Sequence, residues 1–175
     1  SYADYYLQDL VGAMGPMHIT AEVLRAHEQY RAGYFTEAIE ITLDKKADVQ
    51  TILEQISGHK VDEHWSPIQV LENGYLKNRP YISRDHDAKT LTYRGADDAE
   101  HTIPYNDGQV KLNWRIDWPA RWWLLGVDAE PFGRDHATKG GSYDTGKVIV
   151  QDIFGAPAPI PVPYHFINRS GETKK

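Results

Sequence analysis

The chain has 175 residues, 41% hydrophobic and 25% charged, which is enough for one hydrophobic core with at most a small satellite. No apolar run approaches the roughly 18 residues that a membrane span needs, and the absence of cysteine excludes disulfides and thiolate metal sites and is typical of a cytoplasmic protein. The net charge of −6 argues against a free-standing nucleic-acid binder, although it leaves local phosphate contacts open to Arg115, Arg121, Arg134 and Lys139.

The first 66 residues are predicted to form three helices that act as structural support. The expected helices cover Ser1–Gly15, Ala21–Ala32 and Thr36 to about Ser57. Thr20 is a suitable N-cap for the second helix and Gly33 its stop, and Thr36 could cap the third. Apolar residues in the third helix repeat with the 3.6-residue period, which indicates that one of its faces lies in the core.

Residues 67–112 differ in pattern from the helical segment before them. Short β-prone runs are separated by turn signals, which lie at Asn73-Gly74, Asp85-His86-Asp87, Gly95 and Asn106-Asp107-Gly108. We therefore expect a small antiparallel β insertion in this part of the chain.

Residues 113–175 return to an α/β pattern. Pro119 suits the first turn of a helix, with Asp117 or Trp118 near its cap. A strand is then expected over Val127–Phe132, with Gly133–His136 as its exit loop. A helix is expected over Ser142–Phe154. A stiff connector should follow at Ala156–Pro163, and a further strand at Tyr164–Ile167. The predicted fold class is thus α/β here, and α+β over the whole chain. Ligands of open α/β sheets bind at the carboxyl ends of strands, so the exit loop is where a site is expected.

The exit loop carries the pattern Gly133-x-Asp135-His136. Glycine lets the backbone approach a ligand, the aspartate can accept hydrogen bonds from ribose hydroxyls, and the histidine can donate to a carboxylate or phosphate. Without its surroundings, the same pattern is equally typical of a turn in which the aspartate caps a helix.

A second glycine-rich segment, Gly140-Gly141-Ser142-Tyr143-Asp144, follows directly. Two glycines before a serine that can cap a helix make a helix N-terminus whose free amides suit an anion. Taken alone, the segment is more simply a capped helix with a flexible entry.

Four of the five tryptophans lie between Trp114 and Trp123. Trp118, Trp122 and Trp123 are expected in the core or at its boundary. Trp114 precedes the expected helix, on the side that faces the strand ends, where its ring could attract a cation. The remaining histidines are scattered without the spacing of metal ligands, so no metal site is predicted.

The stretch Trp114–Gly146 resembles the second half of the nucleotide-binding domain of class I lysyl-tRNA synthetases. The likeness continues to Lys175 and extends weakly upstream through Tyr30-x-x-Gly33-Tyr34 and Trp65-Ser66-Pro67. The closing residues Ser170–Lys175 resemble the approach to that family's Lys-Met-Ser-Lys-Ser loop. His18-Ile19-Thr20-Ala21 does not supply the family's HIGH-like signature. The resemblance therefore implies an internal part of an enzyme, inert in isolation and without measurable lysine-dependent exchange of pyrophosphate into ATP.

The resemblance also implies ligands and residue roles. ATP with Mg²⁺ would be held by Gly133, Asp135, His136, Gly140, Gly141 and Asp144. Lysine would be held by Trp114, His136 and Tyr164, with Asp117 as the candidate carboxylate for its ammonium group. The third substrate would be tRNA(Lys). No side chain of this chain is expected to take part in catalysis. No membrane partner is expected. Some family members carry a zinc knuckle in the insertion; this chain has no cysteine there, so no zinc is expected.

Two alternatives stay open. A glutamate- or arginine-type class I synthetase, or another nucleotidyl transferase of this fold, would differ in few side chains. A non-catalytic module that binds RNA or protein belongs to a different class altogether.

Overall fold

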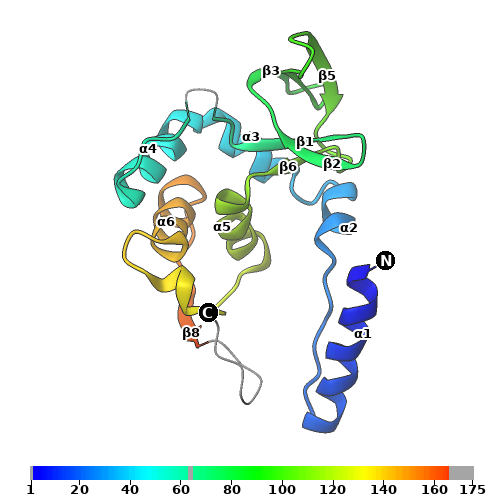
Figure 1. The fold of residues 1–175 in the computed structure, drawn as a ribbon, viewed down its shortest axis with the longest axis vertical. Helices are drawn as coiled ribbons and strands as arrows, with labels where there is room; N and C mark the ends of the chain where they lie inside the picture. The colour runs from blue at the N-terminus through cyan, green and yellow to red at the C-terminus, as the bar shows by residue number, and fades with distance from the viewer. Residues whose placement is uncertain (1, 63–64, 166–175) are drawn as a thin grey trace, which may run out of the picture.

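The computed structural model describes residues 2–62 and 65–165. Figure 1 shows helices α5 (Trp114–Leu125) and α6 (Ser142–Val148) close to helix α4 (Lys46–Ser57), with two small antiparallel sheets beyond α3 (Thr36–Asp44). Helix α1 (Tyr2–Met14) lies apart from this body. Mixed helices and small sheets of this kind agree with the α+β class expected from the sequence.

The second predicted helix is much shorter than expected. It does not begin at Ala21 after a Thr20 cap: α2 covers only Ala26–Arg31, and its N-cap, Arg25, makes no side-chain cap hydrogen bond. The cause is a lack of packing, because Val23 and Leu24 are 42% and 47% exposed. A short helix without a buried apolar face is marginal in water, whatever its capping residue.

The third predicted helix is two helices, α3 and α4, which meet at Lys45. The Lys45 ammonium donates to the Ile153 carbonyl at 2.9 Å, while the Glu40 carboxylate on α3 accepts from Lys89 of the insertion at 2.7 Å. Because the helix is interrupted at Lys45, α3 can contact the insertion while the junction with α4 contacts the C-terminal part of the chain. Thr36 is not the N-cap either; its hydroxyl donates to the Gly33 carbonyl at 2.7 Å.

The antiparallel strands expected in the insertion are present. One three-stranded sheet has the order β2-β1-β6 and the other β3-β4-β5. The strands are β1 (Ile68–Glu72), β2 (Tyr75–Asn78), β3 (Tyr81–Asp85), β4 (Thr90–Arg94), β5 (Glu100–Pro104) and β6 (Val110–Leu112). Asn73 and Gly74 both have positive φ, 51° and 81°, which confirms the predicted hairpin turn between β1 and β2.

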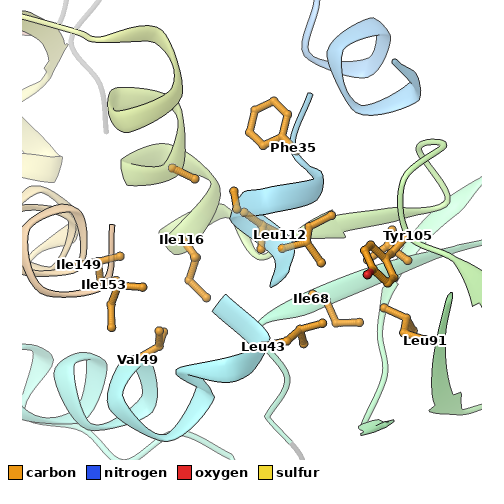
Figure 2. Close-up of a cluster of buried hydrophobic side chains, with 14 of the residues drawn as sticks. Phe35, Leu43, Val49, Ile68, Leu91, Tyr105, Leu112, Ile116, Ile149 and Ile153 are labelled. Atoms are coloured by element: carbon orange, nitrogen blue, oxygen red, sulfur yellow. The ribbon is translucent and has the colours of Figure 1, made fainter. Parts of the chain in front are cut away.

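One hydrophobic core joins the helices, the insertion and the C-terminal part. Figure 2 shows Val49 of α4 and Ile116 of α5 facing Ile149, while Ile68 and Leu112 of the insertion continue the same cluster. All five side chains are fully buried. A smaller cluster contains Trp122, Phe132, Tyr143 and Val150. The shared core fixes the insertion against α5.

Helix α5 begins earlier than its sequence predicts. It starts at Trp114, and the side chain of Asn113 caps it by accepting from the Arg115 amide at 3.5 Å. Pro119 therefore lies inside the helix instead of in its first turn. Ile116 and Ala120 are fully buried, and burying them outweighs the hydrogen bond that proline cannot donate.

The C-terminal part contains a parallel pair of strands, β7 (Ala129–Gly133) and β8 (Ile160–Tyr164). β8 lies in the expected proline-rich connector and starts at Ile160, whose amide donates to the Asp128 carbonyl at 2.8 Å. The backbone nitrogens of alternate residues point to the same edge of a strand, so those of Pro161 and Pro163 point away from β7, to the open edge, where proline is tolerated. Phe166 and Ile167, the end of the strand predicted from Tyr164, and the terminal segment Ser170–Lys175 lie outside the described residues.

Between these strands the chain forms two helical segments. A 3₁₀ helix over Arg134–Ala137 follows β7, and α6 runs directly into a π-helical turn at Ile149–Ile153. The helix expected over Ser142–Phe154 is thus present, in two geometries. The register pairs Gly133 with Tyr164, so both strands end at the same edge, beside the 3₁₀ helix.

Candidate functional site

The site lies where β7 ends. A Cβ on Gly133 would come within 2.6 Å of an Asp135 carboxylate oxygen, so any other residue here would make this exposed side chain move aside. Asp135 Oδ2 lies 3.8 Å from His136 Nε2, and their side chains are 57% and 39% exposed. The two polar groups therefore face the same region and both reach solvent.

His136 lies between two tryptophans of α5. Its ring centroid is 5.9 Å from that of Trp114 and 5.6 Å from that of Trp118, both in edge-to-face arrangements. Trp114 is 47% exposed. We call Trp114, Trp118 and His136 the aromatic slot.

Trp118 packs at the boundary of the smaller cluster, as predicted, and it also belongs to this slot, which was not predicted. The missed signal was the spacing of four residues between Trp114 and Trp118, which places both rings on one face of a helix. That signal was hidden because the helix was expected to begin only at Pro119. Trp122, by contrast, is 2% exposed, as predicted.

Arg115 and Ser142 complete one side of the slot. The Arg115 guanidinium lies 4.7 Å from the Trp114 ring centroid and donates to the Ser142 hydroxyl at 3.3 Å. That hydroxyl is also 3.5 Å from His136 Nδ1. Among the described residues Arg115 has no carboxylate partner, so its positive charge is available to an anion.

Ser142 does not cap α6, contrary to the sequence prediction. The N-cap position is Gly141, and no side chain there accepts a cap hydrogen bond. Since the Ser142 hydroxyl accepts from Arg115 instead, its contribution is to join α5 to α6.

The two glycines before α6 are shaped by close contacts. Gly140 has φ +74°, and a Cβ there would lie 2.7 Å from the Ile56 carbonyl oxygen. Its amide donates to Asp144 Oδ2 at 3.0 Å, and the Gly141 amide donates to the Thr138 carbonyl at 2.7 Å. These two amides are therefore engaged within the chain and are not free for an anion in this conformation.

Asp144 holds this loop together. Its Oδ1 lies 3.0 Å from the Lys147 ammonium while its Oδ2 accepts from Gly140. The hydrogen bond from Lys147 keeps the pKa of Asp144 below its usual value, and the Gly140 amide acts in the same direction against partial burial. Asp144 is thus ionised at neutral pH.

Asp117 lies in the interior and does not line the aromatic slot, which corrects its prediction as a partner for an ammonium group. It is 4% exposed, accepts from the Tyr30 hydroxyl at 2.6 Å and forms an ion pair with Arg121. Burial, reinforced by Asp117, raises the pKa of the Tyr30 phenol well above its usual value. The three side chains form a structural contact between α2 and α5.

Tyr164 lies at the same edge as Gly133, and it is 51% exposed. Its ring makes no stacking contact with the slot or with any other ring of residues 2–62 and 65–165. Beside it, Arg134 contacts His165 Nε2 at 2.6 Å. Tyr164 is therefore close to the site in register but outside the aromatic slot.

A cavity of about 440 Å³ also has Trp114 in its wall. Its wall combines the end of α4 with the first two strands of the insertion and the start of α5. Trp65, Gln69, Asn78, Asn113, Trp114 and Arg115 lie among its lining residues. Trp114 and Arg115 therefore border both this cavity and the aromatic slot.

Within the described residues, no three His, Asp or Glu side chains gather in a way that could hold a metal ion. No helix in that part of the chain is long and apolar enough to cross a membrane.

Comparison with known proteins gives the family. The model of the class I (K) tRNA synthetases matches residues 1–175. Lysine--tRNA ligase 1 of Methanosarcina acetivorans is 46% identical over 169 residues, covering 95% of this chain and 32% of the relative. The lysine--tRNA ligases of Methanocaldococcus jannaschii and Thermococcus kodakarensis are 36% and 34% identical, covering 95% and 100% of this chain but 32% and 34% of the relatives. The chain thus spans about a third of the length of these relatives. It belongs to the class I (K) tRNA synthetase family.

Proposed function

We propose that this chain supplies part of the active site of a lysine--tRNA ligase, in which it holds ATP and lysine for adenylate formation. Residues 113–175 would be the second half of a Rossmann-like nucleotide-binding domain, with residues 1–66 as a helical support and residues 67–112 as the insertion. The supporting observation is the position of His136 between Trp114 and Trp118, beside Asp135, at the end of β7. The names of the relatives, all lysine--tRNA ligases, agree with it.

In this proposal the aromatic slot holds the lysine side chain. The faces of exposed rings attract an ammonium group through cation–π contact, worth about 0.5–2 kcal/mol depending on burial. Asp135, exposed beside His136, supplies the negative charge that Asp117 cannot. Tyr164, at the neighbouring strand end, would close the slot once substrate is present.

Arg115 would meet the negative end of the reacting pair. It lies against Trp114 without a carboxylate partner in the described part of the chain, so its guanidinium suits the lysine carboxylate or the α-phosphate. The ATP ribose would lie over Gly133, where the backbone comes close and Asp135 can accept from its hydroxyls. Gly140, Gly141 and Asp144 would shape the loop beneath the nucleotide.

The reaction itself needs little side-chain chemistry. The lysine carboxylate attacks the α-phosphorus of ATP, and the bond to the leaving pyrophosphate breaks, giving lysyl-adenylate. The terminal ribose hydroxyl of tRNA(Lys) then attacks the lysyl carbonyl and releases AMP. Mg²⁺ would accompany ATP as part of the substrate. This chain would act by positioning the reactants and by stabilising charge on the phosphate oxygens.

The test compares amino acids in the full-length protein that contains this chain. Lysine, arginine and glutamate are offered in turn with ATP and tRNA, and aminoacyl-tRNA formation is measured for wild type and for Asp135→Asn. Lysine attachment that Asp135→Asn weakens mainly through the KM values for ATP and lysine supports the proposal. Attachment of arginine or glutamate instead of lysine, or an Asp135→Asn variant with wild-type kinetics, contradicts it.

A further inference from the structure

Ser142 lies between the guanidinium group of Arg115 and the imidazole of His136. Its hydroxyl oxygen is 3.3 Å from Arg115 Nη1 and 3.5 Å from His136 Nδ1. Ser142 itself is 7% exposed, so water has little access to this contact. Beyond His136, an Asp135 carboxylate oxygen lies 3.8 Å from Nε2. We call these four side chains the polar row, in the order Arg115, Ser142, His136 and Asp135.

The loop before α6 brings His136 close to Ser142. A Cβ on Gly141 would lie 3.0 Å from the His136 carbonyl oxygen and 2.6 Å from that of Thr138. Glycine therefore lets the 3₁₀ helix approach the start of α6. The Gly141 amide donates to the Thr138 carbonyl at 2.7 Å, and the Thr145 hydroxyl donates to the Ser142 carbonyl at 2.9 Å. These contacts fix the backbone on both sides of Ser142.

The chemistry of arginine sets the direction of the hydrogen bonds in the polar row. A guanidinium group has only donors, so the Ser142 oxygen accepts from Arg115. The hydroxyl hydrogen is then left to donate, and His136 Nδ1 is its only other partner among residues 2–62 and 65–165. A ring nitrogen that accepts carries no proton, so a neutral His136 holds its proton on Nε2.

A positively charged His136 would not fit the polar row. Both ring nitrogens of an imidazolium are donors, so the Ser142 oxygen would face two donors and its own hydrogen would lack an acceptor. A positive ring would also pair with the Asp135 carboxylate, 3.8 Å away. That distance is too long for a hydrogen bond, so the neutral ring leaves the carboxylate to a ligand.

A neutral imidazole suits a slot that receives a cation. Trp114 and Trp118 flank the His136 ring at centroid distances of 5.9 and 5.6 Å. A positive charge on that ring would repel an ammonium group placed among the three rings. With its proton fixed on Nε2, His136 adds no charge to the slot, and Asp135 keeps its negative charge for the guest.

We propose that Ser142 is a positioning residue that holds His136 as the neutral Nε2–H tautomer, so that the aromatic slot accepts the lysine ammonium group. The inference rests on the proposed function, because lysine is the substrate that brings the positive charge. Ser142 touches neither lysine nor ATP in this scheme. It acts through His136, and Arg115 directs its hydroxyl.

Nitrogen NMR of the full-length protein that contains this chain tests the tautomer directly. Only histidine is labelled with ¹⁵N, and the His136 signals are those that His136→Gln removes. At neutral pH, Nδ1 is expected to show the shift of an unprotonated ring nitrogen and Nε2 that of a protonated one. Ser142→Ala should bring the two shifts closer together, because either nitrogen can then carry the proton. Ser142→Thr keeps the hydroxyl and should retain the wild-type pattern.

Aminoacylation kinetics of the same protein test the consequence for lysine. Ser142→Ala is expected to raise the KM for lysine about fivefold, the equivalent of one lost hydrogen bond, with smaller changes in kcat and in the KM for ATP. The matched control is Ser66→Ala. Ser66 is 2% exposed, and its hydroxyl accepts from the Ile68 amide at 3.4 Å. This control is expected to match wild type in both the NMR pattern and the KM for lysine.

The outcomes separate this inference from the proposed function. A wild-type protein that attaches no lysine to tRNA contradicts the proposed function. Normal attachment with the proton on Nδ1 in the wild-type protein, or with an NMR pattern that Ser142→Ala leaves unchanged, overturns only the role of Ser142. Equal rises in the KM for lysine in Ser142→Ala and Ser66→Ala would also overturn it, because both would then reflect a general loss of stability. The wild-type spectrum needs no Ser142 variant, so it decides even where Ser142→Ala fails to fold.

Discussion

His136 meets Trp114 edge to face, with ring centroids 5.9 Å apart and an angle of 66° between the planes. The two rings come from different elements, the 3₁₀ helix after β7 and the first turn of α5. Ser142 ties them together, since its hydroxyl lies within 3.5 Å of both His136 Nδ1 and the Arg115 guanidinium. The proposed lysine site thus depends on three elements meeting at one point.

Replacing His136 with alanine should weaken lysine binding while the chain stays folded. His136 is 39% exposed, so little packing is lost. If a cation–π contact of about 0.5–2 kcal/mol is removed, the KM for lysine should rise about 2- to 30-fold. The measurement is steady-state aminoacylation by the full-length protein, with His101→Ala, in the insertion, as the control. A KM for lysine that changes equally in both variants would remove His136 from the site.

Asp117→Ala should destabilise the chain instead of altering substrate binding. The substitution leaves the Tyr30 hydroxyl and the Arg121 guanidinium without their buried partner, a loss that typically costs about 3–5 kcal/mol. Urea unfolding of the 175-residue chain measures it, with exposed Asp128→Ala expected within about 0.5 kcal/mol of wild type. A stable Asp117→Ala protein with a raised KM for lysine would restore Asp117 to the lysine site.

Gly140→Ala should cost more than Gly155→Ala, although both glycines have positive φ, +74° and +70°. The backbone strain of about 1–2 kcal/mol is common to both. Only at Gly140 does the new Cβ also meet a backbone atom, the Ile56 carbonyl oxygen at 2.7 Å, while nothing lies within 4 Å at Gly155. The difference between the free energies of unfolding of the two variants measures the cost of the clash at Gly140. Equal losses of stability would mean that the loop before α6 moves to accommodate the new Cβ.

Glu40 should make the stability of the chain sensitive to acid. Burial alone would raise the pKa of Glu40, but hydrogen bonds from Lys89 and Tyr105 outweigh it and hold the pKa below its usual 4.5. A lowered pKa in the folded state stabilises the protein above pH 4.5, and this contribution is lost as the pH falls through the lowered value. Urea unfolding between pH 7 and pH 3 should show a steeper loss for wild type than for Glu40→Gln. The control Glu37→Gln, exposed on the same helix, should retain the wild-type slope.

Features encoded by neighbouring residues could be predicted from the sequence. The hairpin at Asn73-Gly74 needs two positive φ angles, which asparagine and glycine adopt readily. The turn at Gly133 and the helix from Ser142 were likewise visible in the local pattern. The hairpin depends on conformations that few residue types adopt, whereas Gly133, at φ −62°, has ordinary extended backbone.

Features decided by distant contacts could not be predicted in this way. Pro119 marks a helix start by local preference, yet burial of Ile116 and Ala120 carries the helix through it. Thr20 is a good cap for a helix that has nothing to pack against. The role of Asp117 follows from Tyr30, far away in the sequence, and no local pattern connects the two.

The common core has a mechanical consequence. Ile68 and Leu112 of the insertion fill the same interior as Val49 of α4 and Ile149 of the C-terminal part. The insertion cannot swing outward as a hinged flap without exposing that interior to water. Any opening of this part of the chain must therefore take place at elements outside the shared core.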